Sequence, residues 1–296
     1  MAKTVCIYGE SGAGKTTLIG ELAEHVYEQT GKQTLLYTSD QGGEESIQPY
    51  IDLGIIQTVR INNIDPWVWS NNTSQGLIPD GKGGWDRADL SKIGLIANES
   101  LQSLAALMMQ NLADKSARGI SIGGDSMVRF KATDGRESVD IGGSNRTHYG
   151  IVQNRIARDV RRGFALPVDW VLWTSSVTRD EDPNSNRRVV GPEVVGKALA
   201  TEVPRWFHYT FRAEGEPAKG NIAGEHLLYL TNYLDKAAGN AVGLCNVRMP
   251  KDAPPLKKAI VKPANIVEAL TIAQEGQKTA TAAIKARQKA RPNRER

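Results

Sequence analysis

The sequence is poor in cysteine and has no long hydrophobic run. Two of its 296 residues are cysteines, Cys6 and Cys245, and no CxxC pair occurs. This usage argues against a disulfide framework or a zinc-ribbon site and fits a reducing compartment. No apolar run approaches the roughly 18 residues of a membrane-spanning helix, and no signal-peptide pattern opens the chain. We therefore expect a cytoplasmic protein with no membrane partner.

Composition and charge are ordinary for a globular chain. Hydrophobic residues make up 40% and charged residues 24%, which excludes a collagen-like or wholly disordered chain. The formal net charge of +4 is unevenly placed, because basic residues dominate residues 279–296. Such tails often bind nucleic acid, and the alternative is a solvated C-terminus.

One motif is individually specific. Residues 9–16 match the phosphate-loop pattern G-x-x-x-x-G-K-[ST] in full. A β-branched run at 3–8 precedes the loop, and a helical pattern at 16–29, closed by Gly31, follows it. Loop N–H groups would bind phosphate, Lys15 would reach the β- and γ-phosphates, and the Thr16 hydroxyl would bind Mg²⁺. The predicted nucleotide-binding residues are Gly9, Glu10, Ser11, Gly12, Ala13, Gly14, Lys15, Thr16 and Thr17.

Strand and helix patterns alternate along the chain. Runs at 33–38, 55–61, 119–123 and 168–174 predict strands, and helical patterns cover 95–115 and 147–162. This alternation predicts an α/β fold with a mainly parallel central sheet flanked by helices. Two later runs, 206–212 and 226–231, predict antiparallel strands.

The chain divides into three predicted regions. A core spans 1–250, a proline-rich linker 251–263, and a C-terminal helix with the basic tail 264–296. Within the core, residues 62–94 form an insertion that carries Trp67, Trp69 and Trp85. We expect these tryptophans to pack the insertion onto the body; the alternative is base stacking or a subunit contact.

A second carboxylate is expected at the end of another core strand, where it would hold the metal ion through water. Asp125 follows the strand pattern 119–123 and is the candidate. Thr16 and Asp125 are therefore the predicted metal-binding residues. The alternative is that Asp125 closes an Asx turn at a strand end.

In this order, the features resemble the RecA-like recombination ATPases, and most of all the compact phage-encoded members that contain the ATPase core alone and are associated with single-strand annealing. The resemblance covers residues 3–232. It rests on the phosphate loop, Asp125-Ser126, the run 168–175, which resembles the family's strand that ends in a polar phosphate sensor, and Gly196 to Leu199. It implies a RecA-like P-loop NTPase core that binds ATP and Mg²⁺, hydrolyses ATP and acts as a homo-oligomer, in the host cytoplasm if phage-encoded. Single-stranded DNA would bind the segments 127–146 and 177–193.

The sequence departs from this family at the phosphate sensor, where Thr174, Ser175 and Ser176 stand in place of an amide, and at the catalytic glutamate. The family's glutamate falls on Gln41, which cannot act as a base. Asp40, Glu44 or Glu45 would then polarise the attacking water; otherwise hydrolysis is slow or absent. The resemblance also places Lys197 and Arg205 where a neighbouring subunit's cation reaches the γ-phosphate, unless each pairs with a surface carboxylate such as Glu193 or Glu202. The predicted catalytic residues are Lys15, Asp40, Glu44, Asp125, Lys197 and Arg205.

Basic side chains are the predicted DNA contacts. Those in the two segments are Arg129, Lys131, Arg136, Arg179, Arg187 and Arg188. The arginines at 155, 158 and 162 share one helix face, which is interpreted as a solvated face beside Asp159; the alternative is that this stripe follows a phosphate backbone. The four histidines lack metal-ligand spacing and are assigned structural roles.

Two other functions stay open from the sequence. A P-loop kinase would use 177–193 as a lid with catalytic arginines. A non-hydrolysing nucleotide-binding assembly factor would explain Gln41.

Overall fold

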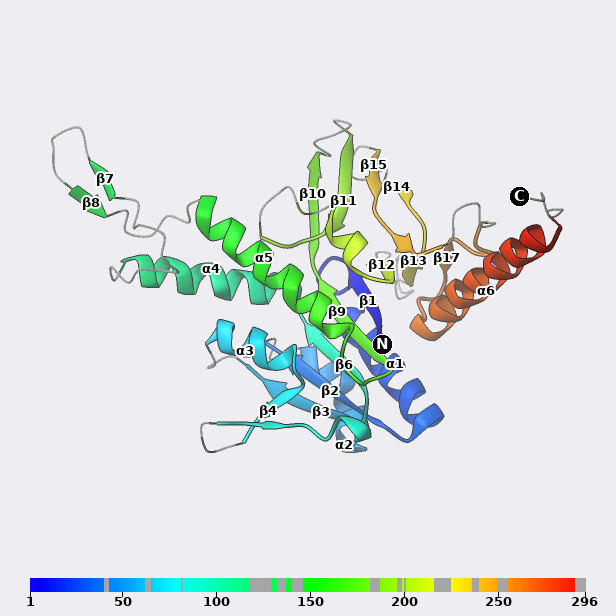
Figure 1. Ribbon diagram of the computed structural model, residues 1–296, viewed down its shortest axis with the longest axis horizontal. Coiled ribbons are helices and arrows are strands. Elements are labelled where there is room, and N and C mark those ends of the chain that lie inside the picture. The colour runs from blue at the N-terminus through cyan, green and yellow to red at the C-terminus, as the bar shows by residue number, and fades with distance from the viewer. Residues whose placement is uncertain are drawn as a thin grey trace, which may run out of the picture.

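A mostly parallel sheet forms the centre of the computed structural model (Figure 1). The structure describes residues 1–39, 43–61, 65–80, 82, 84–117, 129–131, 137–139, 146–181, 187–195, 199, 201–215, 225–235, 240–249 and 255–290. In order across this sheet, the strands are β17 (Ile260–Val261), β13 (His226–Tyr229), β12 (Tyr209–Gly215), β1 (Lys3–Tyr8), β9 (Trp170–Ser175), β6 (Ile93–Glu99), β2 (Gln33–Thr38) and β3 (Ile56–Arg60), and β16 (Asn246–Val247) pairs with β12.

The strand directions confirm the predicted mixed α/β fold. Every neighbouring pair from β12 across to β3 is parallel. The late strand β13 runs antiparallel to β12, as expected for the run 226–231, and β16 and β17, which the sequence did not predict, are also antiparallel to their neighbours. The prediction for 206–212 was partly wrong, because residues 203–206 form a 3₁₀ turn and β12 is parallel to β1.

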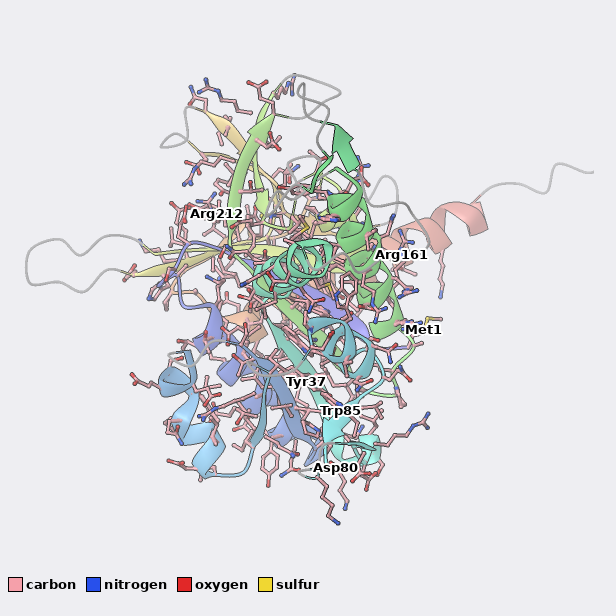
Figure 2. The ribbon with its side chains drawn as sticks, turned by 90° about the vertical axis from the view of Figure 1, so that its left-hand side faces the viewer. Met1, Tyr37, Asp80, Trp85, Arg161 and Arg212 are labelled. Carbon is pink, nitrogen blue, oxygen red and sulfur yellow. The ribbon has the colours of Figure 1, made fainter. Side chains whose placement is uncertain are left out.

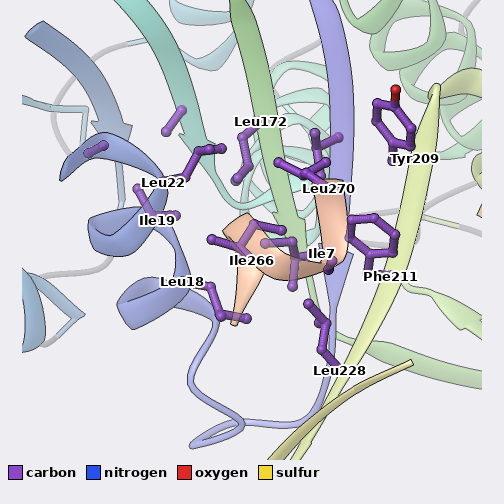
Figure 3. Close-up of a cluster of buried hydrophobic side chains, with 14 of the residues drawn as sticks. Ile7, Leu18, Ile19, Leu22, Leu172, Tyr209, Phe211, Leu228, Ile266 and Leu270 are labelled. Carbon is purple, nitrogen blue, oxygen red and sulfur yellow. The ribbon is translucent and has the colours of Figure 1, made fainter. Parts of the chain in front are cut away.

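Helices cover both faces of the sheet. The helices α1 (Lys15–Thr30) and α6 (Ile266–Ala290) share one buried cluster with the strands, and Figure 3 shows Leu18 and Leu22 of α1 facing Ile266 and Leu270 of α6 there. The opposite face is covered by α3 (Pro66–Thr73), α4 (Leu101–Ala117) and α5 (Arg146–Gly163). The carboxyl-terminal ends of the parallel strands therefore all lie at one end of this three-layer structure, between the two layers of helices.

The segment 95–99 is a strand, which corrects the expected helical start at Leu95. β6 is buried at every position and lies between β2 and β9, and α4 begins at Leu101. A strand in the middle of a sheet with helices on both faces is apolar on both sides. Its sequence therefore resembles a segment of buried helix.

The insertion at 62–94 packs onto the body, as expected. It contains α3, the hairpin β4 (Leu77–Pro79) and β5 (Trp85–Arg87), and the short turn η2 (Leu90–Lys92). Trp69 is fully buried against α4 and α5, and the Trp67 indole donates to Asn111 Oδ1 at 2.9 Å. Trp85 is half-buried in the hairpin (Figure 2).

The two segments expected as loops contain strands. Residues 177–193 form β10 (Val177–Glu181) and β11 (Arg188–Pro192), an antiparallel hairpin that continues into β15 (Ala241–Gly243) and β14 (Tyr233–Asp235) as a second sheet. Within 127–146, β7 (Arg129–Lys131) pairs with β8 (Glu137–Val139), well away from the main sheet in Figure 1. Among the described helices, none combines the length and the apolar character needed to cross a bilayer.

The last helix was predicted at 264–288 and is observed as α6. It packs against α1. The strand β17 lies inside the range predicted as a linker and pairs with β13. The division into core, linker and tail stays a prediction.

Candidate functional site

Three glycines shape the loop that joins β1 to α1. Gly12 and Gly14 have φ values of 76° and 81°, in the left-handed region that favours glycine. A Cβ atom on Gly9 would lie 2.3 Å from the carbonyl oxygen of Ala213. Gly14 is the N-cap of α1 and brings no side chain to cap it. The loop therefore delivers backbone N–H groups to the positive end of a helix, which is an arrangement suited to an anion.

The Lys15 ammonium lies inside this loop. Its Nζ donates to the carbonyl oxygens of Gly9 at 2.9 Å and of Glu10 at 2.8 Å. A pocket of about 560 Å³ opens beside it, within the size range of small-molecule sites. Its lining residues are Ser11, Gly12, Gly14, Lys15, Thr16, Thr17, Gly43, Ser46, Glu99, Ser100, Gln102, Ser103, Thr174, Ser176 and His226.

Glu99 is the carboxylate that the fold brings to the loop. It is the last residue of β6 and is 6% exposed. The Thr16 hydroxyl donates to Glu99 Oε1 at 2.5 Å, and the Thr38 hydroxyl donates to Oε2 at 3.5 Å. Because β6 and β1 are parallel and are separated by β9, their carboxyl ends reach the same edge. Sequence reasoning missed Glu99; its signal is a polar pair, Asn98-Glu99, closing an apolar run.

Thr174 adds a buried hydroxyl to the same edge. Thr38 pairs with Glu99 across β2 and β6, Asn98 pairs with Trp173, and Ile7 pairs with Thr174. Glu99 and Thr174 therefore directly follow the Asn98–Trp173 pair on their two strands. Thr174 is 0% exposed and lines the pocket, and its Oγ1 has no hydrogen-bond partner among the described residues. A buried hydroxyl without a partner is costly, so this atom indicates a place for a ligand or an ordered water.

Several predicted catalytic residues lie outside the described residues. These are Asp40, Asp125 and Lys197, together with Gln41. Their roles stay predictions.

Glu44 is among the residues that the structure describes, and an arginine binds its carboxylate. It is 5% exposed, and Arg60 Nε donates to its two carboxylate oxygens at 3.0 and 3.1 Å. Its neighbours Gly43 and Ser46 line the pocket, and Glu44 itself is not among the lining residues. A carboxylate engaged in this way is poorly placed to activate water.

Arg205 and the phosphate loop lie at opposite ends of the parallel strands. Its guanidinium pairs with Glu202 at 2.9 Å, which is the surface pair that the sequence left open. β12 is parallel to β1, with Val5 beside Tyr209, so Arg205 precedes the amino end of its strand. The phosphate loop of the same chain follows the carboxyl end of β1.

The second sheet contacts the phosphate loop directly. Arg179 of β10 pairs with Glu10 of the loop at 2.8 Å, and both side chains are more than half exposed. The Tyr8 hydroxyl donates to the carbonyl oxygens of Leu244 at 2.8 Å and of Val190 at 3.3 Å. Burial, followed by the nearby Glu10 charge, raises the pKa of Glu193. Arg179, predicted as a DNA contact, is thus engaged at the loop.

On the arginine-rich face of α5, Arg155 forms a structural clamp with Asp159 and with Ser70 of α3. Arg155 Nε donates to Asp159 Oδ2 at 3.0 Å and to Ser70 Oγ at 2.9 Å. Asp159 is 1% exposed and also contacts the Ser70 hydroxyl. Burial raises the pKa of Asp159 to about 6, outweighing the arginines, of which Arg155 has the largest lowering effect. The interpretation of a wholly solvated face was wrong for Arg155, which ties α5 to α3, whereas Arg158 is exposed.

The pocket suits a cation that binds oxygen. Among the described residues, no group of three or more His, Cys, Asp or Glu side chains could form a metal cage. Thr16 and Glu99 instead offer one hydroxyl and one carboxylate at the phosphate loop. This donor set fits Mg²⁺, which retains waters and binds through one or two protein oxygens together with substrate phosphates.

Comparison with known proteins found no match to the chain, either among protein-family models or among curated proteins.

Proposed function

We propose that the chain binds ATP with Mg²⁺ and hydrolyses it as a RecA-like P-loop ATPase that acts on DNA in recombination or single-strand annealing. The observation that carries this proposal is the contact of Thr16 with Glu99 beside Lys15. A phosphate loop, a lysine and a hydroxyl–carboxylate pair around one pocket are the parts that Mg²⁺-dependent phosphoryl transfer uses. ATP rather than another nucleotide is carried over from the family resemblance.

The residues around the pocket have separate proposed roles. The loop N–H groups and Lys15 hold the phosphates, and Thr16 and Glu99 hold the metal ion, which supplies charge neutralisation when bound. Thr174 offers a buried hydroxyl at the same edge, where the resemblance expects a phosphate sensor. The water-activating residue stays predicted at Asp40 or its neighbours, because Glu44 is occupied by Arg60.

Exposed arginines support the DNA part of the proposal. Arg187 and Arg188 border the hairpin of β10 and β11, and Arg158 and Arg161 are exposed on α5; Figure 2 labels Arg161 on that helix. Exposed positively charged side chains are the means by which proteins contact a phosphate backbone. The action as a homo-oligomer rests on the resemblance alone.

The test is ATP hydrolysis by the purified protein, with and without single-stranded DNA. We expect Mg²⁺-dependent hydrolysis that rises with DNA, and loss of it in Lys15→Ala. An Arg187→Ala/Arg188→Ala double variant should keep the DNA-free rate and lose the stimulation. Asp52→Asn, which changes an exposed carboxylate outside the pocket, is the control. Nucleotide binding without any hydrolysis would overturn the ATPase.

One observation favours a second candidate, a P-loop kinase. Arg179 of the β10–β11 hairpin reaches the phosphate loop through Glu10, as a lid arginine would. Phosphate appearing on an added acceptor, in place of free phosphate in solution, would support the kinase.

A further inference from the structure

His226 forms a wall of the pocket that the proposed phosphate chemistry leaves unused. It begins β13 and is exposed, and its backbone is fixed because it pairs with Gly215 and its carbonyl oxygen accepts from Ala264 N at 2.7 Å. Its ring lies against the loop, 3.7 Å from the position that a Cβ atom on Gly14 would take.

Glu99 and His226 lie on opposite sides of β1, and their positions indicate which way a bound nucleotide would lie in the pocket. Thr16 contacts Glu99 on β6, two strands from β1 on one side. His226 is on β13, two strands from β1 on the other side. Thr16 and Glu99 would hold a metal ion on the β6 side of the loop, where it would neutralise charge on the terminal phosphates. The terminal phosphates would therefore lie toward β6. The remainder of a nucleotide then leaves the loop toward β13.

We propose that His226 is the platform on which the nucleoside part of the bound nucleotide rests, through stacking of its imidazole on the base or contact with the ribose. This inference rests on the proposed function, because it needs a nucleotide in the pocket. A flat aromatic ring beside an open polar pocket can stack on any base. His226 lines the pocket, whereas the neighbouring Glu225 does not and is paired with Lys262 at 3.0 Å.

Two ligands distinguish the contribution of the nucleoside to binding from that of the phosphates. Mg²⁺–ATP carries both parts, and Mg²⁺–tripolyphosphate carries the phosphates alone. We expect His226→Ala to weaken ATP binding by about tenfold, within the range known for base stacking, and to leave tripolyphosphate binding within about twofold of the parent. His226→Phe should retain most of the affinity for ATP. His25→Ala, a half-buried histidine of α1 outside the pocket, is the matched control.

Titration calorimetry with both ligands gives distinct outcomes. Equal weakening of ATP and tripolyphosphate in His226→Ala would show that the ring supports the loop and would overturn the proposal. Unchanged ATP binding in that variant would overturn it as well. If the parent protein binds neither ligand, the proposed function itself fails. If the parent binds both with equal affinity, the phosphate site stands and the nucleoside platform is refuted.

Discussion

Glu99 and Asp159 are two carboxylates with almost the same burial and different surroundings. Glu99 is 6% exposed and Asp159 is 1% exposed. Glu99 accepts from the hydroxyls of Thr16 and Thr38 and faces the pocket. Asp159 is held by Arg155 and Ser70 between two helices.

The difference teaches that burial alone does not mark a functional carboxylate. A buried charge is expensive unless it is paired or coordinates a metal ion. Asp159 meets this requirement inside the protein, through Arg155. Glu99 lies beside the hydroxyl of the phosphate loop and lines the pocket, so its carboxylate is placed to take part in binding a cation. Four experiments test this contrast.

The largest expected effect is on catalysis. Glu99→Gln keeps the shape of the side chain and removes the negative charge that would hold the metal ion. We expect the rate of ATP hydrolysis to fall by roughly two to three orders of magnitude, because metal-ion catalysis contributes several kcal/mol. Asp159→Asn should leave the rate within about twofold, since it lies outside the pocket. Steady-state phosphate release measures both, and equal losses in the two variants would remove the contrast.

The next effect is on stability. Arg155→Ala leaves the Asp159 carboxylate buried without its closest cation, so we expect the free energy of unfolding to fall by about 3 kcal/mol at pH 8. Arg158→Ala, an exposed arginine on the same helix, should change it by less than about 0.5 kcal/mol. Urea unfolding followed by fluorescence measures both variants. If Arg155→Ala behaves like Arg158→Ala, the clamp contributes nothing.

A smaller effect depends on pH. Folding raises the pKa of Asp159 from its ordinary 3.8 to about 6, so the folded protein holds this proton over a pH range in which the unfolded chain has released it. The contribution of Asp159 to stability is therefore lost as the pH rises from about 4 to 6. Relative to Asp159→Asn, the parent should lose roughly 2 kcal/mol across this range. Calorimetric melting at several pH values checks this, and a constant difference would contradict it.

The smallest effect concerns an ion pair at the pocket mouth. Arg179 and Glu10 are both more than half exposed. Arg179→Ala should therefore lower the free energy of unfolding by less than about 1 kcal/mol, and the loss should shrink in about 1 M salt. Chemical denaturation at low and high salt measures it. A loss that persists in salt would mean that this pair behaves like the buried clamp.

The phosphate loop and its flanking elements could be predicted from the sequence. The runs at 3–8 and 33–38 are β1 and β2, and Gly31 ends α1 with its N–H bonded to Tyr27 O at 2.7 Å. These signals are local, because glycine and strand patterns act within a few residues. The mostly parallel sheet follows from their alternation.

The other side of the site could not be predicted, because it depends on strand order. Glu99 is 83 residues from Thr16 along the chain, and only the placement of β6 two strands from β1 brings them together. The buried pattern of β6 also resembled a helix, which hid the residue at its end. His226 reaches the pocket from β13 for the same reason. The hairpin of β10 and β11 had a local signal, the run Asp182 to Asn186 rich in turn residues.

Tyr8 joins the two sheets at the last residue before the phosphate loop. Its hydroxyl is bonded to the carbonyl oxygens of Val190 in β11 and of Leu244, which directly follows β15, while its backbone belongs to the main sheet. Tyr8 therefore links the phosphate loop to the second sheet. A ligand that binds the β10–β11 hairpin and shifts Tyr8 would change the affinity of the loop for an anion. The bound anion would then change the affinity of the hairpin for that ligand by the same factor.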